Sequence, residues 1–188
     1  MAFPSRIETP RLIVRRYQPE DAALLKAAID QSLDRLQPWM PWAREEPTPL
    51  PELAARLATF ADRFDAGLEW VVGIFDRQEQ TLLGGAGLHR RGPEHVLEIG
   101  YWIRTGAEGH GYVSEAIEAL RRVAGRVSGV THLRICCDPQ NERSAAIPQR
   151  LGFVSLGVTP NDGAEAEGDR DYTATWEWTI PKDDDSAS

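Results

Sequence analysis

A glycine turn near the middle of the chain constrains the fold more than any other feature. Gly109-His110-Gly111 follows the apolar run Val96–Ile103 and precedes residues 113–127, where apolar side chains recur at helical spacing. A strand, a glycine turn and a helix start in this order leave unpaired backbone N–H groups at the positive end of a helix, and such a row binds phosphate. Glycine admits positive φ angles and close approach of a ligand to the backbone. The turn therefore predicts a nucleotide-like ligand, although such glycines also form tight connections that bind nothing.

A second segment follows about thirty residues later. It begins Asn141-Glu142-Arg143-Ser144 and ends Leu151-Gly152-Phe153. Together the two segments resemble the motifs of the GNAT acetyltransferase superfamily, which are a glycine loop before a helix and, later, an Asn, a short helix and Leu-Gly-Phe. Further matches are Leu36-Gln37-Pro38-Trp39-Met40-Pro41-Trp42-Ala43, residues 84–89 and residues 98–103. The chain resembles the RimJ/RimL-type branch, which acetylates N-terminal amines of ribosomal proteins, and the resemblance covers residues 7–180.

Two positions depart from the pattern of the first motif. Glu108 stands where the family usually carries Gln or Arg, and Val113 stands where it carries Gly or Ala. An acid facing a pyrophosphate would repel it, so we expect Glu108 to point to solvent and its usual role to be lost or altered. Val113 is the milder change, because that position mainly supplies a backbone N–H. Neither change removes the row of backbone amides.

The resemblance implies an α+β protein with the GNAT fold. Its central sheet would be mixed and mostly antiparallel, with helices on both faces and a splayed strand pair that holds acetyl-CoA. The sequence patterns agree, with strands expected at residues 12–16, 70–75, 81–88, 96–103, 133–136, 153–158 and 172–180 and helices at 22–36, 52–65 and 113–127. Asn141 is expected to cap a further short helix that Pro148 interrupts or bends. We expect one domain over residues 7–180 and a disordered acidic tail over residues 181–188.

Composition narrows the classes of partner. The formal net charge of −8 over 188 residues disfavours nonspecific binding to nucleic acid or anionic membranes and favours amine-bearing acceptors. No apolar run approaches the ~20 residues that span a bilayer, and no apolar signal segment opens the chain, so we expect a cytoplasmic protein. Cys136 and Cys137 are neighbours that point to opposite faces of a strand, so neither a metal site nor a disulfide is expected. The sequence does not distinguish a monomer from a homodimer.

The resemblance also implies how acetyl-CoA, the cosubstrate, would be held. The strand ending at Tyr101, Trp102 and Ile103 would pair with the pantetheine amides, and an amide near Tyr101 would polarise the thioester oxygen. Asn141 would hydrogen-bond the pantetheine arm from the other side. The pyrophosphate would lie on the amides of Gly109, His110, Gly111, Tyr112, Val113 and Ser114.

Direct attack by an amine needs two proton transfers, because the ammonium must lose a proton and the leaving thiolate must gain one. Ser144 lies at the family position proposed to protonate the thiolate or to hydrogen-bond the sulfur. Its alternative role is that of an ordinary polar residue in the first turn of a helix.

Glu98 is the first acid/base candidate and would also contact the acceptor. It interrupts an apolar strand, where a carboxylate is costly unless it is exposed or paired. The alternative is a structural ion pair with Arg90, Arg91 or Arg134. His89 ends the adjacent strand and titrates near neutrality, which makes it the second base candidate.

Trp39 and Trp42 are the candidate acceptor-binding residues. The resemblance places the connection between the first two helices over the acceptor side, and an indole offers a flat face with one N–H donor. The alternative is that these side chains fill the core, as we expect of Trp70, Trp176 and Trp178.

Three functions remain open at this point. The first is acetylation of a protein N-terminus. The second is the same chemistry on a small toxic amine, such as an aminoacyl-nucleotide or an antibiotic, which would confer detoxification or antibiotic resistance. The third is a non-catalytic acyl-CoA-binding sensor, which Glu108 and Val113 favour and which Asn141 and Ser144 oppose.

Overall fold

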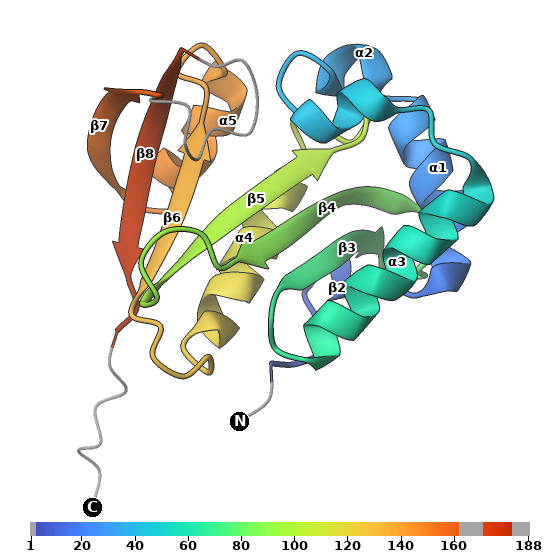
Figure 1. Ribbon diagram of the computed structural model, residues 1–188, viewed down its shortest axis with the longest axis horizontal. Coiled ribbons are helices and arrows are strands. Elements are labelled where there is room, and N and C mark those ends of the chain that lie inside the picture. The colour runs from blue at the N-terminus through green and yellow to red at the C-terminus, as the bar shows by residue number, and fades with distance from the viewer. Residues whose placement is uncertain (1–2, 162–170, 182–188) are drawn as a thin grey trace, which may run out of the picture.

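One sheet runs through the whole protein (Figure 1). The computed structural model describes residues 3–161 and 171–181, and within them the strand order is β1-β2-β3-β4-β5-β6-β8-β7. The strands are β1 (Arg6–Glu8), β2 (Leu12–Arg16), β3 (Trp70–Asp76), β4 (Leu82–His89), β5 (Val96–Ile103), β6 (His132–Cys137), β7 (Val154–Pro160) and β8 (Tyr172–Thr179). The helices are η1 (Pro19–Asp21), α1 (Ala22–Asp30), α2 (Leu33–Leu36), η2 (Pro41–Glu45), α3 (Leu50–Asp65), α4 (Tyr112–Ala124) and α5 (Glu142–Arg150).

The sheet opens between β5 and β6. These two strands are parallel, whereas the other neighbouring pairs are antiparallel. Their pairing covers only Val96–Glu98 of β5 against residues 132–134 of β6, and beyond this point the strands run apart (Figure 1). The expected mixed sheet with a splayed strand pair is therefore confirmed.

Helices cover both faces of the sheet. Because side chains of a strand alternate between faces, Leu12 and Val14 of β2 join the core beneath α4, while Ile13 joins the core beneath α1 and α3. On α4, Ile117 and Leu120 are fully buried. Val113, which replaces the Gly or Ala of the family motif, is buried in the same core. Its larger side chain therefore faces the core.

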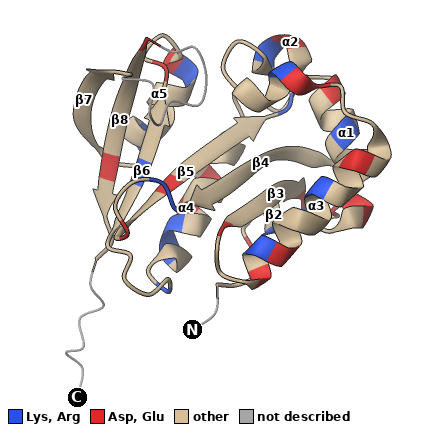
Figure 2. Cartoon of the chain, in the orientation of Figure 1, with Lys and Arg blue, Asp and Glu red and all other residues tan. Residues whose placement is uncertain are grey.

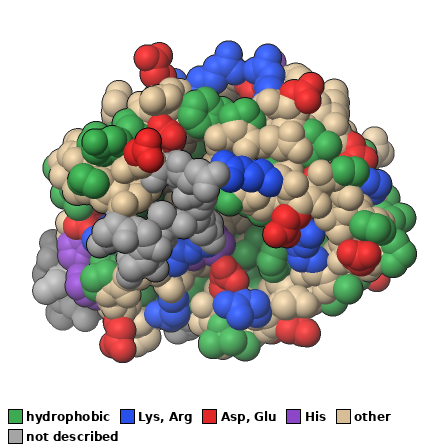
Figure 3. Space-filling model, turned by 45° about the horizontal axis from the view of Figure 1, so that its top comes forward, with side chains coloured by type: hydrophobic (Ala, Val, Ile, Leu, Met, Phe, Trp, Pro, Cys, Tyr) green, Lys and Arg blue, Asp and Glu red, His purple; other side chains and the backbone are tan. Residues whose placement is uncertain are grey.

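Charged residues of both signs occur in the helices, the strands and the loops (Figure 2). Both signs follow one another along α3 (Figure 2), and on the face shown in Figure 3 basic and acidic side chains are interspersed. Among the described residues, no helix is long and apolar enough to cross a membrane. Apart from Pro181, the acidic tail expected over residues 181–188 lies outside the described residues.

The helix expected over residues 22–36 is wrong as a single element. It is divided into α1 and α2 at Ser32, which is buried. The Ser32 hydroxyl donates to the carbonyl of Ala28 at 2.6 Å and accepts the N–H of Thr105 at 2.9 Å. A serine that bonds to nearby backbone competes with the helix, and here it also ties the helix end to the loop between β5 and the glycine turn.

The other differences are smaller. The strand β1 and the short helix η2 have no counterpart in the sequence expectations, and α4 ends at Ala124, before residue 127. Asn141 caps α5, as expected, by accepting the N–H of Ser144 at 3.1 Å. Pro148 lies inside α5 without ending it.

Candidate active site

A cavity of about 610 Å³ lies over the β4 and β5 floor, between η2 and α3 on one side and the start of α5 on the other. It brings together eight of the residues proposed from the sequence, namely Trp39, Trp42, His89, Glu98, Tyr101, Trp102, Asn141 and Ser144. Ile103 and residues 109–114 do not line it, because the glycine turn lies beyond the end of β5. The candidate catalytic groups therefore share one cavity, and the candidate phosphate site is separate from it.

Glycines form the floor of this cavity. A Cβ atom added to Gly85 would lie 2.6 Å from Nε1 of Trp102, and one added to Gly87 would lie 2.4 Å from Nε2 of His89. Both rings can approach the sheet this closely only because these positions have no side chain. This role was not expected from the sequence, although Gly84-Gly85-Ala86-Gly87 inside an apolar strand is a signal for it.

Glu98 is both paired and open to the cavity. It accepts a hydrogen bond from Nη1 of Arg91 at 2.9 Å, so the expected alternative of an ion pair forms with this arginine. Arg134 instead pairs with Glu177 at 3.0 Å. Next to Glu98 lies Cys136, and burial, together with the charge of Glu98, raises the pKa of its thiol to about 11.

His89 is held by a residue that the sequence analysis missed. Its Nδ1 atom contacts Oε1 of Glu69, whose other oxygen accepts from Nε of Arg63 at 2.8 Å. The hydrogen bond from His89 is the main cause that lowers the pKa of Glu69 to about 2, and Arg63 acts in the same direction against the opposing effect of burial. The hairpin register offered a signal, because Trp70 pairs with Leu88 and continuing the ladder sets Glu69 opposite His89.

Ser144 is tied to β5 by Tyr101. The Tyr101 hydroxyl donates to the backbone carbonyl of Ser144 at 2.8 Å, and the Ser144 hydroxyl donates to the Tyr101 oxygen at 3.2 Å. Burial raises the pKa of the Tyr101 phenol, so this hydroxyl keeps its proton. Pro148 lies four residues after Ser144 and lacks an N–H, so the Ser144 carbonyl receives the tyrosine hydroxyl where a helix would supply an amide.

The glycine turn has the geometry of an anion site. Gly109 and Gly111 have φ angles of +77° and +75°, and Gly111 is the N-cap of α4. A Cβ atom built on Gly109 would meet nothing within 4 Å, so the turn forms an open cradle. His110 stacks on Tyr112 with the ring centroids 5.4 Å apart. Arg11, which the sequence analysis missed, donates to the His110 carbonyl at 2.8 Å.

Glu108 does not point freely to solvent, and this expectation is corrected. Its carboxylate accepts the N–H of Gly106 at 2.6 Å and pairs with Arg35 of α2 at 3.0 Å. Burial opposes ionisation, but backbone hydrogen bonds and the charges of Arg35 and Arg143 lower the pKa of Glu108. The Glu108 carboxylate thus binds the backbone of its own loop, and Arg35 offsets its charge.

Three indoles meet in the cavity. Trp39 and Trp42 come from α2–η2, and Trp102 comes from β5; Trp42 and Trp102 pack edge to face with their ring centroids 5.9 Å apart. Trp42 and Trp102 also pack against the core beneath α1 and α3, whereas Trp39 does not. Trp70 and Trp176 are buried in the core beneath α4, and Trp178 is partly buried against it, as expected.

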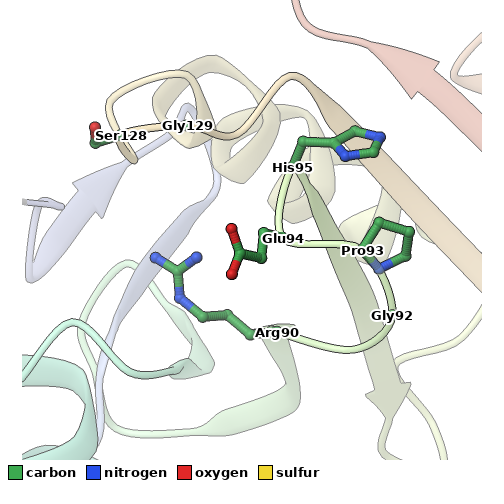
Figure 4. Close-up of a pocket in the computed structure, with 7 residues that line it drawn as sticks. All are labelled: Arg90, Gly92, Pro93, Glu94, His95, Ser128 and Gly129. Atoms are coloured by element: carbon green, nitrogen blue, oxygen red, sulfur yellow. The ribbon is translucent and has the colours of Figure 1, made fainter.

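A second hollow of about 470 Å³ lies at the other end of β5 (Figure 4). It is lined by Arg90, Gly92, Pro93, Glu94, His95, Ser128 and Gly129, which belong to the loops before β5 and before β6. The glycine turn follows β5, so this hollow is remote from it. Within the described part of the chain, no group of three or more His, Cys, Asp or Glu side chains is arranged to hold a metal ion.

The sequence matches the model of a known protein family. The acetyltransferase (GNAT) domain matches residues 11–154. The chain belongs to the GNAT acetyltransferase family. This confirms the resemblance that the two motifs carried and the α+β fold that it implied.

Individual relatives agree with the Rim-type branch of the GNAT family. The [ribosomal protein uS5]-alanine N-acetyltransferase of Escherichia coli (strain K12) is 31% identical over 155 residues, which cover 81% of this chain and 79% of that protein. The microcin C7 self-immunity acetyltransferase MccE, solved with acetyl-CoA and AMP, superposes with a TM-score of 0.82 at 18% identity, covering 94% of this chain and 97% of that one. RimL, the ribosomal L7/L12 alpha-N-protein acetyltransferase in complex with coenzyme A, has a TM-score of 0.80 at 19% identity, with 96% and 98% covered. The two superpositions show the GNAT fold.

The ionised Glu69 makes the stability of this GNAT protein sensitive to acid. Because the pKa of Glu69 is lowered from 4.5 to about 2, its contribution is fully present above pH 4.5 and is lost as the pH falls toward 2. Over this interval we expect the free energy of unfolding of the wild type to fall by up to ~3 kcal/mol more than that of Glu69→Gln. Urea denaturation at a series of pH values measures the free energy of unfolding of the wild type and of Glu69→Gln. If the two free energies fall in parallel with pH, Glu69 does not have a lowered pKa.

Proposed function

We propose that this GNAT protein transfers the acetyl group of acetyl-CoA to the N-terminal amine of a protein. The observation that carries the proposal is the single cavity in which Glu98, His89 and Ser144 meet beside the opening between β5 and β6. The similarity to the uS5-alanine N-acetyltransferase, at 31% identity over most of both chains, supports a protein acceptor. Such an acceptor is consistent with the expected cytoplasmic location.

The residues present fit acetyl-CoA. The open edge of β5 at Tyr101, Trp102 and Ile103 offers backbone groups to an extended arm, as an exposed strand edge does for a peptide. Asn141 and Ser144 face this edge from the start of α5. The N–H groups of residues 109–114 lie at the positive end of α4, where a pyrophosphate is stabilised. The cosubstrate supplies the activated acetyl group.

The side chains of the cavity supply the proton transfers. Glu98 and His89 lie opposite each other on β5 and β4, so an ammonium between them would meet a carboxylate and an imidazole. The Ser144 hydroxyl would hydrogen-bond the sulfur and protonate the leaving thiolate. Bringing the amine and the thioester together in one cavity contributes the larger share of the rate, because it replaces an encounter in solution with a fixed geometry.

A small amine acceptor is the second candidate function. The three indoles of Trp39, Trp42 and Trp102 favour it, because a cavity lined by indoles suits the face of a ring. This reading would make the protein a detoxifying or antibiotic-resistance enzyme. The sensor hypothesis loses support, because the charge of Glu108 is offset by Arg35 and the bulk of Val113 faces the core.

The glycine turn can be tested by substitution. Gly111→Val places a β-branched residue at a φ of +75°, which only glycine adopts without strain, and shifts the amides that would hold the pyrophosphate. We expect the affinity for acetyl-CoA, measured by calorimetry, to fall more than ~10-fold, or about 1.4 kcal/mol. Gly67→Val is the matched control, because Gly67 has a φ of +68° and follows α3. Unchanged affinity in Gly111→Val would remove the phosphate assignment.

Glu98→Gln tests the carboxylate in the cavity. The amide keeps the shape of the side chain but cannot take a proton or attract an ammonium. Turnover should fall by ~10²-fold or more while acetyl-CoA affinity and the melting temperature remain close to those of the wild type. Thiol release followed with a saturating amine measures the rate. Equal turnover would reduce Glu98 to a structural partner of Arg91.

Trp39→Ala separates the acceptor role from the packing role. Trp39 lines the cavity without joining the core cluster, so its loss should raise the acceptor KM by roughly 5- to 150-fold, the effect of ~1–3 kcal/mol of stacking, at an unchanged melting temperature. Trp178→Ala, at a partly buried indole outside the cavity, is the control. A lower melting temperature with intact acceptor kinetics would reject the pocket assignment. An effect confined to nucleoside-like amines would favour the small-molecule function over the N-terminal one.

A further inference from the structure

The imidazole of His89 is fixed by one of its nitrogens. Glu69 is ionised and therefore only accepts hydrogen bonds, so Nδ1 of His89 is the donor in their contact. Arg63 binds the second carboxylate oxygen of Glu69 at 2.8 Å and holds the carboxylate in place. In the neutral ring, a proton on Nδ1 leaves the lone pair on Nε2.

The second nitrogen faces the cavity floor. A Cβ atom on Gly87 would lie 2.4 Å from Nε2, and one on Gly100 would lie 3.5 Å from it, and both glycines line the cavity. Gly87 and Gly100 are paired across β4 and β5, so the ring lies over a patch of sheet without side chains. Glu98 pairs with His89 in the same ladder and presents its carboxylate from the same face.

We propose that Nε2 of His89 takes the proton of the acceptor ammonium and that Glu69 is the positioning residue for this base. The inference rests on the proposed acetyl transfer and names how its site is activated. Glu98 then serves to attract the ammonium, and the imidazole accepts the proton. A carboxylate behind an imidazole selects the tautomer and stabilises the imidazolium that forms.

The proposed acetyl transfer conserves atoms and charge. One N–H bond of the ammonium breaks, and its proton moves to Nε2 of His89. The freed nitrogen lone pair forms the bond to the acetyl carbon while the carbon–sulfur bond breaks and its electrons leave with the thiolate. The nitrogen then loses a second proton, and the thiolate gains one through Ser144. The imidazolium returns its proton to water, so the products are an amide, a thiol and one released proton.

Several charged or titratable side chains surround this ring. Glu69, before β3, contacts the ring, and Arg63 from α3 binds Glu69. The other charged or titratable side chains that line the same cavity include Glu45 of η2, Arg56 of α3, Arg91 after β4, Glu98 of β5, Cys136 of β6 and Asp138 after it. Burial keeps Cys136 a neutral thiol, because its pKa is raised to about 11. Glu69 is the charged group in direct contact with the imidazole, so its removal should have the largest effect on the protonation of the ring.

The pH profile of kcat/KM for the acceptor tests the proposal. In Glu69→Gln the rate should fall ~10-fold or more, and the acidic limb should move to lower pH, because an imidazolium without a neighbouring anion releases its proton more readily. Glu69→Asp should restore part of the rate and the position of the limb. Glu118→Gln is the control, since Glu118 is ion-paired with Arg121 and Arg122 on α4 and does not line the cavity.

The tautomer of His89 gives a second readout that needs no turnover. In a long-range proton–nitrogen spectrum, with the four histidines separated by the variant His89→Gln, the neutral ring of the wild type should carry its proton on Nδ1, and Glu69→Gln should lose this preference. Wild-type thiol release together with an unmoved acidic limb in Glu69→Gln overturns this inference and leaves the acetyl transfer standing. Absence of thiol release from the wild type with every peptide and nucleoside amine overturns the proposed function, and the inference falls with it.

Discussion

The early end of the pairing between β5 and β6 is the constraint on which the site depends. β5 pairs with β4 from Glu98 to Ile103 but with β6 only over Val96–Glu98. The free edge of its second half presents backbone groups that a ligand can pair with, as β-strand addition does in peptide recognition. The same strand carries Glu98 at the end of its pairing with β6, and a loop of residues 104–108 joins its far end to the glycine turn. One strand therefore sets the distance between Glu98 and the glycine turn proposed to hold the pyrophosphate.

The floor of the cavity depends on a second constraint, the absence of side chains at Gly85 and Gly87 of β4. Gly85 and Gly87 alternate with Ala86 and Leu88, which are buried beneath α4 on the other face. An ordinary strand would place side chains on both faces and fill the space that Trp102 and His89 occupy. The strand thus packs a core on one face and leaves room for rings on the other. The cost is the larger conformational entropy that each glycine loses on folding.

Local patterns explain what the sequence could predict. Alternation of apolar residues located most strands, the glycine turn located the start of α4, and Asn141 capped α5 as its residue type requires. The contacts that were missed join segments far apart in the chain, such as Glu69 with His89 and Arg35 with Glu108. No spacing rule within one element encodes these pairs. The division of the first long helix was missed for the same reason, because Ser32 ends it by bonding to Thr105.

The proline inside α5 leaves a backbone carbonyl free to bind a side chain of β5. A proline in a helix removes one amide donor and leaves the carbonyl four residues earlier without its helical partner. In α5 that carbonyl belongs to Ser144, and the hydroxyl of Tyr101 takes the place of the missing donor. The Ser144 hydroxyl returns a hydrogen bond to the same tyrosine, so two bonds join α5 to β5 across the opening of the sheet. The group proposed to protonate the thiolate is therefore positioned by the strand that also carries Glu98. Tyr101 therefore resists a shift of α5 as a whole, in addition to the packing of this short helix, and keeps Ser144 in a fixed position relative to Glu98.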